Sequence, residues 1–82
     1  PVNTSAPTGA RLAQWLGLLH GEVGLNAAEA LPVAMTLSKG RIEPSQWLQL
    51  TESFLFDAGI ELHCRERILV AVRKRLKALT DQ

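Results

Sequence analysis

Two histidines and one cysteine are the residues of this sequence whose side chains could act as base and nucleophile. Cys64 directly follows His63, whereas His20 lies in a different part of the chain. Nucleophilic catalysis requires a thiol or hydroxyl within reach of a base that a third group orients. Successive residues on a helix point about 100° apart, so His63 is not placed to act on Cys64. We therefore expect no enzyme activity and no small-molecule substrate.

A metal or cofactor site is not expected either. A metal site needs three or four ligands at suitable spacing, and two histidines, one cysteine and unpatterned acids fall short of that. Gly21 and Gly24 are not followed by the Lys-Ser or Lys-Thr pair of a phosphate-binding loop. We therefore assign structural or surface roles to His20, His63 and Cys64.

The single cysteine and the hydropathy pattern bear on where the protein works. One cysteine cannot form an intramolecular disulfide, which is typical of reducing compartments, so we expect the cytosol or the nucleus. No uninterrupted apolar run approaches the roughly 20 residues that cross a bilayer. We expect no binding to a membrane surface, because the basic residues of the last helix point away from its apolar stripe.

Charge is distributed unevenly along the 82 residues. The net charge is only +1, but residues 1–64 hold three cations and six carboxylates, whereas residues 65–82 hold six cations and two carboxylates. Opposite charges on different faces allow copies of a domain to associate head to tail. The same charges are compatible with a plain solvated helix, whose basic residues favour the negative end of the helix dipole.

The chain divides into a leader and one helical domain. Residues 1–8 are polar or turn-forming and lack apolar periodicity, which predicts a flexible leader, and residues 9–80 form the domain. Apolar residues at helical spacing predict a first helix over about 10–20, with Trp15 in the core and Gly21 as its end.

The segment 25–40 contains conflicting signals. Asn26 followed by Glu29 indicates a helix start, whereas Pro32 would break that helix at its sixth position. We therefore predict two short helical pieces, with Pro32 in the first turn of the second piece and Gly40 at its end.

Two more short helices are predicted before the last one. Pro44 suits the first turn of a helix that places Trp47 in the core. Thr51 is the expected N-cap of the next helix, and Gly59 is expected just after its end. Nothing in the chain has the period of a strand, so the prediction is an all-α fold.

The last helix, over about 63–79, is the longest. Advancing about 100° per residue gathers its apolar residues on one side. Arg65 lies in the same direction within the first turn, where it can either reach outward to a partner or be held by Glu61 or another carboxylate in a structural role. Most of the basic residues lie on the other side, with Val70 among them, and point to solvent. The expected buried stripe comprises Ile68, Leu69, Val72, Leu76 and Leu79.

The segment IEPSQWLQLTESFLFDAGIELHCRERILVAV resembles the second half of a sterile alpha motif domain. The pair Trp15 and Leu16 is similar to the Trp-Leu pair of the family's first helix. The resemblance implies a small five-helix bundle of this type with a long C-terminal helix. His63 replaces a small residue usual in the family, and the segment around Pro32 has no counterpart there. The matching residues of the second half are Leu50, Thr51, Gly59, Ile60, Arg65, Ile68 and Leu69.

The resemblance also implies a function, that of a non-catalytic protein-interaction module within a larger signalling, scaffolding or regulatory protein. The partner would be a second copy or another domain of sterile alpha motif type. The opposing surface would use acids of the central helices, Glu43, Glu52 and Asp57. The basic contact surface would begin with His63, Cys64, Arg65 and Arg67 and continue with Arg73, Lys74 and Lys77.

An RNA hairpin is the alternative partner, because some sterile alpha motif domains bind RNA through basic residues at the start of the last helix. Phosphate contacts would come from Arg65, Arg67, Arg73 and Lys74. No aromatic residue stands on the basic side to stack a base, and the turn LHCRER lacks a pair of small residues. We therefore rank a protein partner above an RNA hairpin.

Overall fold

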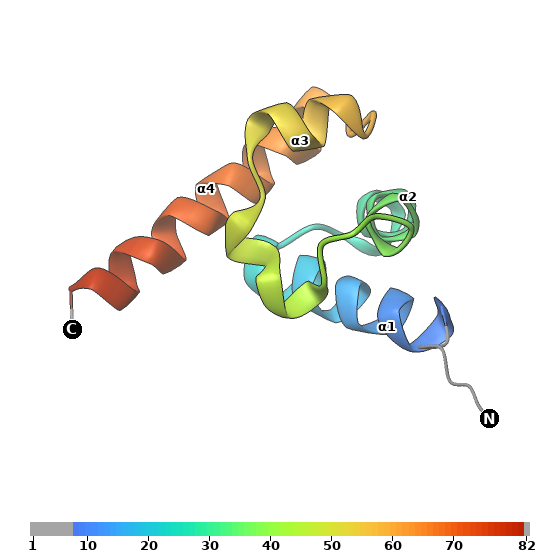
Figure 1. The fold of residues 1–82 in the computed structure, drawn as a ribbon, viewed down its shortest axis with the longest axis horizontal. Coiled ribbons are helices and arrows are strands. Elements are labelled where there is room, and N and C mark those ends of the chain that lie inside the picture. The colour runs from blue at the N-terminus through green and yellow to red at the C-terminus, as the bar shows by residue number, and fades with distance from the viewer. Residues whose placement is uncertain (1–7, 82) are drawn as a thin grey trace.

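The computed structural model describes residues 8–81, which form helices and no strand. The shorter helices pack into a small bundle from which the long last helix extends (Figure 1). The first two elements run on without a break, so the prediction of an all-α, five-helix bundle with a long C-terminal helix is confirmed. In chain order the elements are α1 (Thr8–Leu18), η1 (Leu19–Val23), α2 (Ala27–Ser38), η2 (Pro44–Gln49), α3 (Glu52–Asp57) and α4 (Leu62–Thr80).

The first helix is longer than the sequence predicts. The expected leader comprises residues 1–8. Residues 1–7 lie outside the described residues, and α1 begins at Thr8. The prediction that Gly21 ends the helix is wrong. The chain continues past Gly21 as a π-helical turn, and the helix ends at Gly24, whose φ is 82°. Leu19 and Val23 are both buried, which favours the added turn. The backbone leaves the helix at Gly24 with a positive φ, which glycine adopts easily.

α2 is one continuous helix, so the prediction of two pieces around Pro32 is wrong. Its start is as predicted: the side chain of Asn26 accepts a hydrogen bond from the Glu29 N–H at 2.8 Å, and Glu29 accepts one from the Asn26 N–H at 3.2 Å. Pro32 lies on the exposed side, where water can reach the Ala28 carbonyl that proline leaves without a donor. The stabilisation gained by burying the opposite face of α2 exceeds the cost of that lost hydrogen bond. The buried face includes Ala30, Val33, Ala34 and Leu37.

The two short helices begin as predicted, and the second also ends where the sequence predicts. η2 is a 3-10 helix with Pro44 as its first residue and Trp47 buried. Oγ1 of Thr51 caps α3 by accepting a hydrogen bond from the Phe54 N–H at 3.1 Å. Gly59 follows α3 with a φ of 84°, and this turn directs the chain into α4.

The core lies between α4 and the shorter helices, and α4 packs directly against η1, η2 and α3. Both tryptophans are buried, as the sequence predicts. None of the helices formed by residues 8–81 has the length and apolar character needed to cross a membrane. The largest fully buried side chains are those of Trp15, Leu19, Leu25, Leu37, Leu55 and Ile68.

α4 continues beyond the core. Its buried residues end at Val72, whereas Leu76 and Leu79 are 43% and 53% exposed, so the prediction that they complete the buried stripe is wrong. The 19 residues of α4 extend about 28 Å, whereas the 12 residues of α2 extend about 18 Å. The last turns of α4 therefore run past the other helices (Figure 1).

Candidate functional site

Arg67, predicted to face a partner, is bonded within the chain. Its Nη2 donates to the carbonyl oxygens of Gly24 at 3.0 Å and Val23 at 3.5 Å. Both acceptors lie where η1 ends, so the guanidinium joins α4 to the end of the first helix. Arg67 thereby has a structural role that the sequence does not reveal.

Arg65 is held by a carbonyl group and an aromatic ring, and not by Glu61 or another carboxylate, which was the structural alternative. Its Nη1 donates to the Ile60 carbonyl oxygen at 3.0 Å. The guanidinium carbon lies 5.2 Å from the centre of the Phe56 ring, which is a cation–π distance. The Nε atom is buried and has no hydrogen-bond partner among the described residues. Arg65 therefore stabilises the turn that leads into α4.

His63 and Cys64, the adjacent residues at the start of α4, have different surroundings. Nε2 of His63 lies 2.9 Å from Oε2 of Glu29, so this exposed contact connects α4 with α2. Cys64 is only 2% exposed, and its thiol contacts Oε1 of Glu61 at 3.8 Å. Burial, followed by the charges of Glu61 and Glu29, raises the pKa of the Cys64 thiol. Cys64, predicted to belong to the contact surface, therefore contributes almost no exposed area to α4.

Three cations of α4 have no ion pair in the part of the chain that the structure describes. They are exposed and follow Val70, which is 57% exposed. The spacing i, i+3, i+4 and i+7 places all four residues on one side of the helix. We call this set the basic stripe: Val70, Arg73, Lys74 and Lys77.

Arg75 is the remaining cation of α4, and it is neutralised within the chain. Its Nη2 donates to both carboxylate oxygens of Glu22 at 2.8 Å. This pair joins α4 to η1 about two helical turns further along α4 than the contact between Arg67 and Gly24. The basic stripe is thus distinguished from Arg75 by the absence of such a partner among residues 8–81.

The acids predicted for the opposing surface have different surroundings. Glu43 pairs with Arg11 at 2.6 Å. Glu52 and Asp57 are exposed on α3 and form no ion pair within the described range. Phe56, 64% exposed, lies on the same helix and was not identified from the sequence. The signal was present, because consecutive apolar residues on a helix cannot all face the core. We call Glu52, Phe56 and Asp57 the acidic face.

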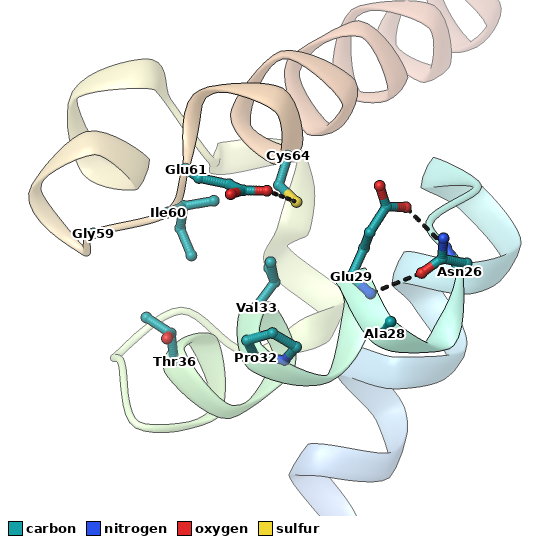
Figure 2. A pocket seen from close by; sticks show the side chains of 10 residues that line it. All are labelled: Asn26, Ala28, Glu29, Pro32, Val33, Thr36, Gly59, Ile60, Glu61 and Cys64. Carbon is teal, nitrogen blue, oxygen red and sulfur yellow. Dashed lines mark hydrogen bonds between the residues drawn. The ribbon is translucent and has the colours of Figure 1, made fainter.

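A groove that the sequence does not reveal lies between α2 and the turn into α4 (Figure 2). Its volume is about 430 Å³, within the range of roughly 300–1,000 Å³ usual for small-ligand sites. Three of its lining residues are buried, namely Val33, Ile60 and Cys64. Two carboxylates, those of Glu29 and Glu61, line it as well. The other lining residues are Asn26, Ala28, Pro32, Thr36 and Gly59.

The side chains first considered for chemistry do not come together. Within residues 8–81, no three histidine, cysteine, aspartate or glutamate side chains are placed to hold a metal ion. Nδ1 of His20 lies 3.2 Å from the carbonyl oxygen of Leu25, which gives that ring a local structural contact. His63 and Cys64 have the separate partners described above.

No protein-family model, curated protein or solved structure matches this chain.

Proposed function

We propose that this chain is a non-catalytic protein-interaction module and that the basic stripe of α4 binds an acidic surface of a partner. One observation carries the proposal: the basic residues of α4 divide into two groups. The basic stripe has no acidic partner among the described residues, so carboxylates of another molecule would be its counterpart. The other group is bonded inside the chain and comprises His63, Arg65, Arg67 and Arg75.

Val70 supports a protein partner. It is 57% exposed and lies one helical turn before Arg73 and Lys74. Protein interfaces combine an apolar centre with a polar rim, whereas a single exposed apolar residue by itself needs no explanation. The position of Val70 beside unpaired cations is therefore what favours a contact surface over a plain solvated helix.

The acidic face on α3 is the counterpart that a second copy would offer. Its two carboxylates are exposed without an ion pair in residues 8–81, and Phe56 adds exposed apolar surface on the same helix. Another domain of sterile alpha motif type is the alternative protein partner. We place the chain in a larger signalling, scaffolding or regulatory protein. A reducing compartment, the cytosol or the nucleus, agrees with the free cysteine.

The contacts of α4 favour protein over RNA. An RNA hairpin read by the start of α4 would need Arg65 and Arg67, and both guanidinium groups donate to backbone carbonyls. No aromatic residue belongs to the basic stripe, so it offers no ring on which a base could stack. Of the four basic residues expected to contact phosphates, only Arg73 and Lys74 form no hydrogen bond or ion pair within the described chain.

Charge reversal tests the basic stripe. Arg73→Glu combined with Lys77→Glu should weaken association more than about tenfold, because attraction to the partner becomes repulsion. Lys39→Glu combined with Arg41→Glu is the matched control, since it changes net charge equally at exposed cations outside α4. Sedimentation velocity over a concentration series measures self-association. Capture of an acidic partner domain with each variant measures association with another protein.

A salt series and a titration with RNA could each contradict a protein contact through the basic stripe. Association through the basic stripe should fall as salt rises from about 0.05 M to 0.5 M, while circular dichroism shows an unchanged fold. A fluorescent RNA hairpin is titrated in parallel. Tight hairpin binding by a monomer would replace the protein partner with RNA. If both double variants associate like the original chain, the basic stripe is not the contact surface.

A further inference from the structure

The charged residues that line the groove beside α2 are both acidic, Glu29 and Glu61. Glu29 is held in position because it accepts a hydrogen bond from the Asn26 N–H at 3.2 Å and contacts His63 at 2.9 Å. Glu61 has one side-chain contact, the thiol of Cys64 at 3.8 Å. A carboxylate has about four acceptor positions, so Glu61 in particular keeps most of its capacity for an incoming donor.

Both carboxylates act on one point of the groove. Cys64 lies between Glu61 and Glu29 (Figure 2), and the charge of each raises the pKa of its thiol in addition to the effect of burial. A cation beside Cys64 would therefore meet two negative groups. The hydrogen bond from the Asn26 N–H lowers the pKa of Glu29, and His63 lowers it further, so this carboxylate is ionised at neutral pH.

Pro32 contributes a further acceptor and an apolar wall. It has no N–H for the carbonyl of Ala28, and both residues line the groove. Helical spacing places them on the same side of α2 as Leu31 and Met35, which are each 46% exposed. An exposed apolar face therefore continues from the groove along α2.

We propose that this groove binds a lysine or arginine side chain presented by a partner peptide. The aliphatic part of that side chain packs against Val33 and Ile60, and its cationic head lies near Cys64 between the two carboxylates. Long basic side chains commonly bury their stems while the charged end stays paired. The apolar face of α2 receives the neighbouring apolar residues, which favours a peptide over a free amine. The basic stripe takes no part, so this inference stands or falls separately from the proposed function.

Two blocked pentapeptides, titrated into the full chain by isothermal calorimetry, test the groove. The first has lysine between leucines, and the second has norleucine in place of lysine, which keeps the stem and removes the charge. We expect saturable binding of the lysine peptide below about 1 mM, at least about fivefold tighter than that of the norleucine peptide. Equal affinities, or no saturation at that concentration, would overturn the proposal.

Variants locate the binding. Glu61→Gln should weaken binding of the lysine peptide about fivefold and leave binding of the norleucine peptide unchanged. Glu66→Gln, at an exposed acid of α4 outside the groove, is the matched control. Ala28→Phe narrows the groove without changing a charge and should weaken binding of both peptides. Circular dichroism checks that this variant keeps the fold. If Glu61→Gln and Glu66→Gln have the same effect, general charge attracts the peptide and the groove does not bind it.

Discussion

Arg67 of α4 donates a hydrogen bond from Nη2 to the carbonyl oxygen of Gly24, 3.0 Å away. Gly24 ends the first helix with a φ of 82°, and a Cβ atom at this position would lie 3.1 Å from the same Nη2. Glycine therefore serves two requirements at once, the left-handed backbone and the close approach of the guanidinium. The contact joins two segments that are far apart in the sequence.

Arg67→Ala should destabilise the fold. Loss of a hydrogen bond from a charged, partly solvated donor should lower the free energy of unfolding by about 1 kcal/mol, which corresponds to a fall in Tm of about 4–8 °C for a domain of this size. Arg73→Ala is the control, because Arg73 has no ion pair within residues 8–81, and it should change stability by less than about 0.5 kcal/mol. Thermal unfolding followed by circular dichroism measures both. Equal Tm values for the two variants would contradict the structural role of Arg67.

Pro32→Ala should stabilise the protein. Alanine restores an N–H for the Ala28 carbonyl within a continuous helix, and proline in a helix interior costs up to about 3 kcal/mol relative to alanine. Pro44→Ala is the contrasting variant, because Pro44 is the first residue of η2, where proline is favoured. We expect a higher Tm for Pro32→Ala and a lower or unchanged Tm for Pro44→Ala. A loss of stability on Pro32→Ala would instead support a second helix that starts at Pro32.

Acid should weaken the connection between α2 and α4. The pKa of Glu29 is lowered from 4.5, first by the hydrogen bond from the Asn26 N–H and then by His63. A lowered pKa in the folded state means that the carboxylate stabilises the fold above pH 4.5 and that this contribution disappears as pH falls through the folded value. Tm measured between about pH 3 and pH 7 should therefore decline on acidification.

Glu29→Gln removes that titration and keeps a side chain able to complete the capping box. Its Tm should be lower than that of the original chain at pH 7 and should fall less steeply below pH 4.5. Glu66→Gln, at a residue without an ion pair in the described part of α4, is the control and should follow the original pH dependence. If the Tm of Glu29→Gln declines below pH 4.5 with the same slope as that of the original chain, Glu29 is not the group that couples stability to acid.

Contacts between residues close in sequence were predictable. Asn26 with Glu29, and Thr51 with the N–H three residues later, form caps whose geometry depends on a single turn of backbone. Gly59 was expected after α3 because few other residues adopt a positive φ easily. The interruption expected at Pro32 was wrong because proline disfavours a helix locally, whereas the burial of a whole helix face decides the outcome.

The candidate site was predictable only in part. The positions of Arg73, Lys74 and Lys77 on the exposed side of α4 follow from helical periodicity alone. Periodicity does not show that the segment around Gly24 receives Arg67, nor that Cys64 is covered by other helices. The groove was likewise not predictable, because its two walls come from α2 and from the turn before α4.

Residue patterns within single segments predict that this chain is helical, where most helices begin, and which side of the last helix is basic. These properties depend on backbone preferences and on side-chain periodicity within one segment. The packing of the helices sets which basic residues have partners inside the chain, where the core ends along α4, and which carboxylates share a groove. Those properties depend on distant segments brought within about 3 Å of one another, a distance that no single segment specifies.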